Sequence, residues 1–149
     1  MIRKIARGKP KKRAKKPIDP QKLKQLKQKR GMRALFARLG FERIASDGIK
    51  FRFKNRDGEL DDIFLIENIL IIAEYTVGKM GTEHVAKKSI LFNHILTYQD
   101  EWVQSYSEFN KAFQAEIDSC SYTAAEMRVK IVYVSLDGVS DDVETAFPS

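Results

Sequence analysis

Acidic side chains flank the apolar parts of residues 58–76 (GELDDIFLIENILIIAEYT), with Glu59, Asp61 and Asp62 before one apolar run and Glu74 after another. An ionisable group at the end of an apolar strand costs free energy unless a partner compensates its charge. Carboxylate oxygens are the ligands that hard divalent cations prefer. We therefore predict that Asp61 and Glu74 hold Mg²⁺ or Mn²⁺. Because strand side chains alternate, Glu59 shares the Asp61 face as a candidate further ligand, and Asp62 faces away.

The same segment predicts a hairpin that brings the two main carboxylates together. Two runs of strand-forming residues, 60–66 and 69–76, are separated only by Glu67-Asn68. A two-residue turn there pairs positions whose numbers sum to 135, so Asp61 faces Glu74. Like charges that face each other across strands repel. A shared divalent cation would remove that repulsion.

These residues resemble a sequence pattern of known nucleases. Residues 58–61 (GELD) are similar to the GEID-type opening of some members of the PD-(D/E)xK nuclease superfamily, and residues 74–76 (EYT) occupy the place of its (Asp/Glu)-x-Lys triplet. The order of expected elements over residues 21–96 also resembles this superfamily, which includes many restriction enzymes and Holliday-junction resolvases. The resemblance implies a restriction-endonuclease-like fold and metal-dependent hydrolysis of phosphodiester bonds.

The resemblance also implies roles for single residues. Asp61 and Glu74 would hold the metal ion together with the backbone carbonyl of Ala73. The triplet, however, ends in Thr76 instead of lysine. Threonine has no charge with which to stabilise the developing charge of the reaction. Members of the superfamily can take this lysine from a neighbouring helix.

A helix predicted over residues 83–96 offers a replacement for the missing lysine. A rotation of 100° per residue groups its apolar side chains on one face, and Lys88 falls on that face. We therefore predict that Lys88 acts in catalysis beside Asp61 and Glu74. The alternative is a lysine whose stem covers apolar surface while its ammonium group reaches water. Lys79, in the preceding loop, is a weaker candidate.

Basic residues are concentrated at the N-terminal end of the chain. Residues 1–33 hold fifteen Lys/Arg and one acid, a net charge of +14, whereas residues 34–149 hold twelve Lys/Arg and nineteen acids, a net of −7. Residues 1–20 have few apolar side chains, which is typical of chain that is disordered in isolation. Such an arm can bind nucleic-acid phosphates, and the alternative is a solvated tail. The candidate phosphate-binding residues are Arg3, Lys4, Arg7, Lys9, Lys11, Lys12, Arg13, Lys15 and Lys16.

Apolar periodicity predicts one α/β domain over residues 21–140. The expected helices are 21–39, interrupted near Gly31, then 83–96 and 100–119. The expected strands are 41–45, 49–54, 60–66, 69–76 and 127–136. We predict a central mixed sheet of about four to five strands flanked by helices. The aromatic side chains predicted to form a buried stripe on the last helix are Trp102, Tyr106, Phe109 and Phe113.

Composition excludes several other classes of site. One cysteine and two histidines, His84 and His94, leave too few ligands for a zinc site. No apolar run is long enough to span a bilayer, and the N-terminus lacks the apolar segment of a secretory signal. We therefore expect a cytoplasmic protein without a membrane partner.

Three functions fit the sequence. The first is a metal-dependent nuclease domain, with DNA as the expected substrate. The second, kept open by Thr76, is a catalytically inactive module of the same fold that binds nucleic acid or a partner protein. The third is an interaction module of a longer protein, because residues 141–149 form a polar tail that ends abruptly, and residues 61–76 resemble nuclease-like front modules from bacterial DNA sulfur-modification neighbourhoods. A homodimer, or contact with further domains of a parent chain, would accompany these functions.

Overall fold

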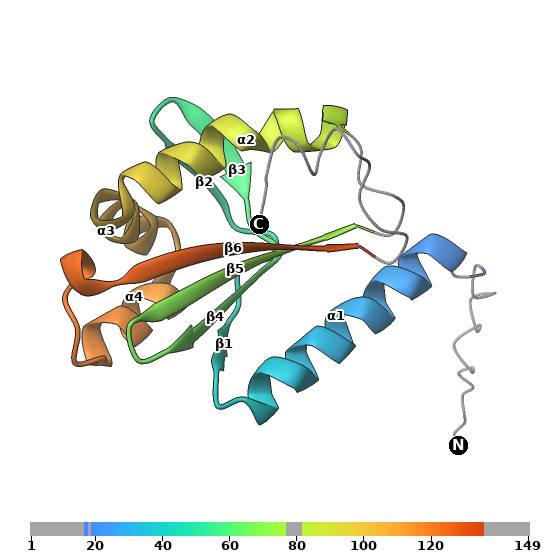
Figure 1. The fold of residues 1–149 in the computed structure, drawn as a ribbon, viewed down its shortest axis with the longest axis horizontal. Coiled ribbons are helices and arrows are strands. Elements are labelled where there is room, and N and C mark those ends of the chain that lie inside the picture. Colours follow the sequence, from blue (N-terminus) through green and yellow to red (C-terminus); the bar gives the residue numbers. More distant parts are fainter. Residues whose placement is uncertain (1–16, 18, 77–81, 136–149) are drawn as a thin grey trace, which may run out of the picture.

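A four-stranded mixed sheet, with helices on both faces, forms the centre of the molecule (Figure 1). The computed structural model describes residues 17, 19–76 and 82–135, and the side chains of these residues apart from 76 and 82–87. The helices are α1 (Pro20–Arg38), α2 (Thr82–Thr97), α3 (Gln99–Phe109), α4 (Lys111–Ser119) and a short 3₁₀ helix η1 (Ala124–Glu126). The strands are β1 (Glu42–Ile44), β2 (Lys50–Phe53), β3 (Arg56–Glu59), β4 (Asp62–Ile66), β5 (Ile69–Thr76) and β6 (Arg128–Ser135).

The sheet has the strand order β1-β4-β5-β6, and β2 pairs with β3 in a separate hairpin. Strands β4 and β5 are antiparallel, with Asp62 opposite Ala73 and Ile66 opposite Ile69. Every pair therefore sums to 135, and the predicted two-residue turn at Glu67-Asn68 is confirmed. Strand β6 returns parallel to β5, so the sheet is mixed. The predicted α/β fold class is confirmed.

The two faces of the sheet carry separate apolar clusters. Helix α1 covers one face, where Phe36 stacks on Phe64 with ring centroids 4.3 Å apart. Helices α2, α3 and α4 contribute to the larger cluster on the other face, which includes Ile72 and the fully buried Trp102. Leu70, Ile72 and Ala73 of β5 are consequently buried, as expected for a central strand, whereas Ile69 at its start is 37% exposed. No helix within the described ranges is long and apolar enough to cross a membrane.

Three details differ from the sequence predictions. Helix α1 runs through Gly31 without interruption, because a single glycine inside a helix costs only about 1 kcal/mol relative to alanine. A separate strand β3 precedes β4, because Lys54 and Asn55 adopt the positive φ angles of a tight turn, 51° and 67°. The predicted helix 100–119 is divided at Asn110, whose side chain accepts a hydrogen bond from the backbone of Phe113 and so caps α4.

The division at Asn110 also corrects one residue of the aromatic stripe. Trp102, Tyr106 and Phe113 are fully buried, with 0% exposure. Phe109, which ends α3, is 45% exposed. It lies in the last turn of the helix, where its ring meets the edge of the core at Phe51, with the ring centroids 6.5 Å apart. The residues of the N-terminal arm (3–16), Lys79 and the tail 141–149 lie outside the described residues, as does the side chain of His84.

Candidate active site

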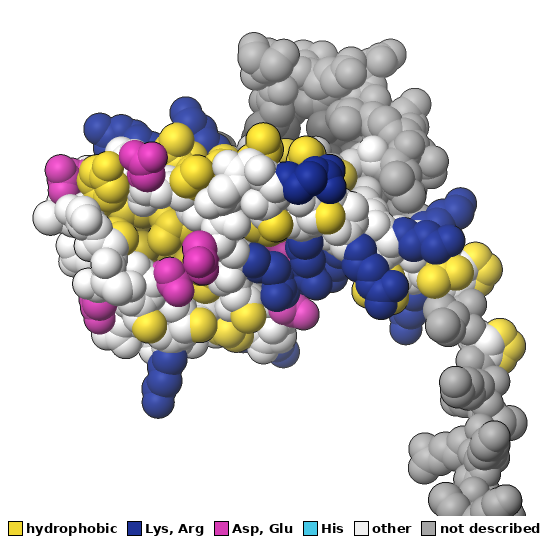
Figure 2. Space-filling model, turned by 90° about the horizontal axis from the view of Figure 1, so that it is seen from below, with side chains coloured by type: hydrophobic (Ala, Val, Ile, Leu, Met, Phe, Trp, Pro, Cys, Tyr) yellow, Lys and Arg dark blue, Asp and Glu magenta, His cyan; other side chains and the backbone are white. Residues whose placement is uncertain are grey.

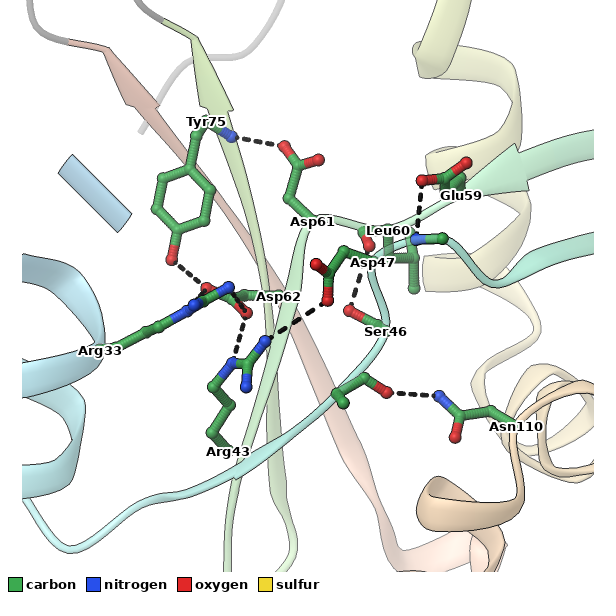
Figure 3. Close-up of polar contacts among 12 residues, drawn as sticks. Arg33, Arg43, Ser46, Asp47, Glu59, Leu60, Asp61, Asp62, Tyr75 and Asn110 are labelled. Carbon is green, nitrogen blue, oxygen red and sulfur yellow. Dashed lines mark hydrogen bonds and ion pairs between the residues drawn. The ribbon is translucent and has the colours of Figure 1, made fainter. Parts of the chain in front are cut away.

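The hairpin β4–β5 brings Asp61 and Glu74 together at the end of the sheet. Figure 3 shows Asp61 beside the backbone of Tyr75, the residue that follows Glu74. Asp61 immediately precedes β4, and the register places it opposite Glu74 in β5. The backbone N–H of Asp61 donates a hydrogen bond to Glu74 Oε2 over 3.1 Å. The backbone N–H of Tyr75 donates to Asp61 Oδ2 over 2.9 Å. Each carboxylate is therefore oriented by the backbone of the facing strand, and the predicted pairing is confirmed.

Glu74 is the more deeply placed of the two acids, with a relative exposure of 1%. Burial raises the pKa of Glu74, and the negative charge of Asp61 raises it further. The positive charge of Lys88 and the two hydrogen bonds to the Glu74 carboxylate offset part of that rise. A second positive charge beside Glu74 would favour its ionised form.

Lys88 lies where the helical periodicity placed it. Its ammonium group forms an ion pair with Glu74 Oε1, although the lysine comes from α2 and the glutamate from β5. The lysine side chain is 30% exposed, so most of it is covered by the surrounding structure. The structure thus joins Asp61, Glu74 and Lys88 into one site, and none of the three is separated from the others by another element.

Glu59 does not join this site. Its carboxylate accepts a hydrogen bond of 2.9 Å from the backbone of Gly48 in the neighbouring loop, and it is exposed (Figure 3). Across the described part of the chain, no three His, Cys, Asp or Glu side chains lie close enough to hold a metal ion together. Ala73 lies within β5 between its partners on β4 and β6, so its carbonyl belongs to the paired part of the sheet.

Asp61 and Glu74 carry the oxygen atoms that could contribute to holding a hard divalent cation at this end of the sheet. One oxygen of Asp61 and one of Glu74 accept backbone N–H groups. The other oxygen of Glu74 faces Lys88, and half-buried Asp61 keeps its second oxygen for a ligand. Mg²⁺ typically uses one or two carboxylates and takes its remaining ligands from water and phosphate. Two carboxylates can supply only part of the coordination shell of such an ion, so they do not suit a closed structural site.

A second charged cluster lies on the opposite face of the same strands, and the sequence did not reveal it. Asp62, with 0% exposure, accepts two hydrogen bonds from Arg33 of α1 (2.9 and 3.1 Å) and one from Arg43 of β1 (2.8 Å). The hydroxyl of Tyr75 donates a further bond of 2.7 Å (Figure 3). Burial alone would raise the pKa of Asp62, but these donors outweigh it and hold the pKa below its ordinary value.

This cluster supports the candidate site from the opposite face of the sheet. Its members are Asp62, Arg33, Arg43 and Tyr75. Asp62 follows Asp61, and Tyr75 follows Glu74, so the two pairs alternate between the faces of the sheet. The cluster fixes α1 and β1 to the strand ends that carry the acids. A sequence signal did exist, since a charged residue opening an apolar strand needs a partner, but nothing in the sequence identified the two arginines.

Comparisons of the chain with protein-family models, with curated proteins and with solved structures found no match.

Proposed function

We propose that this chain is a divergent PD-(D/E)xK-type nuclease domain that hydrolyses phosphodiester bonds of nucleic acid, with DNA as its substrate. The observation that carries the proposal is the convergence of Asp61, Glu74 and Lys88 from three segments of the chain. A cytoplasmic location, where the domain would meet DNA, belongs to the same proposal.

Each of the three side chains has a distinct part. Asp61 and Glu74 supply the oxygens for Mg²⁺ or Mn²⁺. The bound ion would polarise the scissile phosphate and lower the pKa of a coordinated water. Lys88 places an ammonium group beside Glu74, where it can stabilise negative charge that develops on the phosphate. The backbone N–H groups that hold both carboxylates keep them oriented before substrate arrives.

The contact between Lys88 and Glu74 supports Lys88 as a replacement for the lysine that Thr76 lacks. The same contact also favours the second candidate function. An ammonium group already neutralises the buried carboxylate, so the ion pair is satisfied as a purely structural element. An inactive module that binds nucleic acid or a partner protein is therefore the alternative, and activity separates the two.

The test is cleavage of supercoiled plasmid and of a single-stranded oligonucleotide, with Mn²⁺ or Mg²⁺ and with chelator. Asp61→Asn keeps the shape of the side chain and an oxygen for the Tyr75 N–H, but removes the charge. Asp57→Asn removes a charge from an exposed ion pair with Arg52 and is the matched control. Cleavage that requires metal, is lost in Asp61→Asn and persists in Asp57→Asn supports the nuclease. Absence of cleavage, or equal cleavage by both variants, refutes it.

A further inference from the structure

Helix α1 carries a positive charge that the rest of the described chain does not neutralise. It holds seven Lys and Arg residues and no acid. Only Arg33 of these forms an ion pair within the described residues. Figure 2 views the molecule from the side of α1 and shows Lys and Arg side chains gathered along that part of the surface. The seven cations are Lys22, Lys24, Lys27, Lys29, Arg30, Arg33 and Arg38.

Three of these residues share one side of the helix. Lys22, Lys29 and Arg33 are separated by seven and four positions, which places them above one another on an α-helix. Two contacts show where this side lies. Lys29 Nζ is 5.9 Å from the centre of the Tyr75 ring, and Arg33 bonds Asp62. We call these three residues the basic stripe.

The basic stripe ends at the strand ends that carry the candidate active site, but on the opposite face of the sheet. Tyr75 adjoins Glu74 in the chain, and its backbone N–H is bonded to Asp61. Asp62, which holds Arg33, directly follows Asp61. Arg43 of β1 donates to Asp62 Oδ1, which also accepts from Arg33, so a fourth cation stands at this end of the stripe.

We propose that the basic stripe, with Arg43, binds the phosphate backbone of the nucleic acid that the candidate site would cut. The inference rests on the proposed function and names the surface that holds its substrate. Lys22 and Arg33 are about 16 Å apart along the helix axis. Measured along a duplex axis, that distance spans about five base-pair steps. Arg33 and Arg43 are 29% and 33% exposed, and Asp62 fixes their orientation, so they are accessible and preorganised.

An anionic membrane is the main competing partner for a basic helix, since Leu23 and Leu26 of α1 are also exposed. Nucleic acid is favoured by the position of the stripe. A nucleic-acid strand bound along it can pass round the strand ends at Asp62 and Tyr75 to reach Asp61 and Glu74, whereas a lipid surface cannot follow such a path. Phosphate contacts of this kind position the strand and carry no sequence information.

The experiment compares two double variants of the full chain. Lys22→Gln/Lys29→Gln removes two charges from the basic stripe. Lys24→Gln/Lys27→Gln removes two charges from roughly the opposite side of the same helix and is the matched control. Glutamine has a helix propensity close to that of lysine, so α1 should persist in both. Circular dichroism and denaturant unfolding check the fold of each variant.

Binding to a labelled DNA duplex is measured with chelator present, over a series of salt concentrations. Each phosphate contact contributes about 0.9 to the slope of log affinity against log salt. The stripe variant should lose about 1.8 from that slope, and the control variant should keep the slope of the parent. Equal losses in the two variants, or no loss in the stripe variant, would overturn the proposal.

A vesicle measurement addresses the competing partner. If the stripe variant weakens binding to phosphatidylserine vesicles and leaves DNA binding unchanged, the surface is a membrane contact and the proposal is wrong. Because chelator prevents cleavage, the result does not depend on catalysis. A parent that binds DNA through the stripe but never cuts it would refute the nuclease activity and leave the phosphate-binding surface standing.

Discussion

Replacing Asp62 by asparagine should destabilise the fold strongly, although the change adds no bulk. Asp62 accepts four hydrogen bonds, two from Arg33 and one each from Arg43 and Tyr75, and has no exposed surface. An asparagine turns an N–H₂ group toward these donors and leaves the arginines without a counter-charge. Breaking a buried ion pair costs about 3–5 kcal/mol.

The exposure of the two arginines decides where in this range the cost of Asp62→Asn should fall. Arg33 and Arg43 are 29% and 33% exposed, so they regain part of their hydration when the carboxylate is lost. We therefore expect Asp62→Asn to lower the free energy of unfolding by about 3 kcal/mol. The control is Asp57→Asn, whose ion pair with Arg52 is 78% and 59% exposed. Pairs of that kind contribute about 0–1 kcal/mol.

Urea denaturation at neutral pH measures both variants, and a pH series provides a second check. The pKa of Asp62 is held below its ordinary value in the folded state, so its contribution is full above the unfolded value of about 3.9. The contribution is lost as the pH falls through the lowered folded pKa. The difference in free energy of unfolding between the parent and Asp62→Asn should therefore become smaller only in acid. The reasoning would be refuted if Asp62→Asn lost no more free energy of unfolding than Asp57→Asn does, or if its loss did not change in acid.

Four further predictions concern the site and the core. Because burial raises the pKa of Glu74, Mn²⁺ affinity should fall as the pH drops through that pKa, and Mn²⁺ binding in that pH range should release a proton that calorimetry in two buffers detects. Lys88→Met should lower the rate of cleavage by about 10²-fold or more. Mn²⁺ should bind at least as tightly, because no ammonium group then competes for the Glu74 carboxylate. A parallel loss of Mn²⁺ affinity would contradict this prediction. Asn110→Ala should cost about 1–2 kcal/mol in urea unfolding through loss of the α4 cap, and an unchanged midpoint would argue against that cap. Trp102→Ala should cost about 3–5 kcal/mol, and Phe109→Ala, at an exposed position, should cost much less; equal costs would show that the aromatic stripe is wrongly divided.

The parts of the site that the sequence predicted depend on short-range patterns. The register of β4 and β5 follows from a two-residue turn between apolar runs, so Asp61 and Glu74 could be paired before any coordinates. Lys88 followed from helical periodicity in an element that comes soon after β5. In each case the partner lies within about one element of chain, where periodicity is informative.

The missed features depend on tertiary contacts or on single capping side chains. The Asp62 cluster takes Arg33 from a helix and Arg43 from an edge strand, and no spacing rule links them. Asn110 looked like one polar residue in a long helical pattern, but its side chain also donates to the carbonyl of Ala45 and begins a new helix. Glu59 was placed by strand alternation, which stopped applying where β3 ends and β4 has not begun.

A titration that follows Mn²⁺ binding and plasmid cleavage in the same samples tests the central claim most directly. If Asp61, Glu74 and Lys88 form a metal-dependent catalytic site, the rate of cleavage should rise in proportion to Mn²⁺ occupancy, and Glu74→Gln should lose both. Cleavage that does not follow occupancy, or Mn²⁺ binding that Glu74→Gln leaves unchanged, would contradict the account.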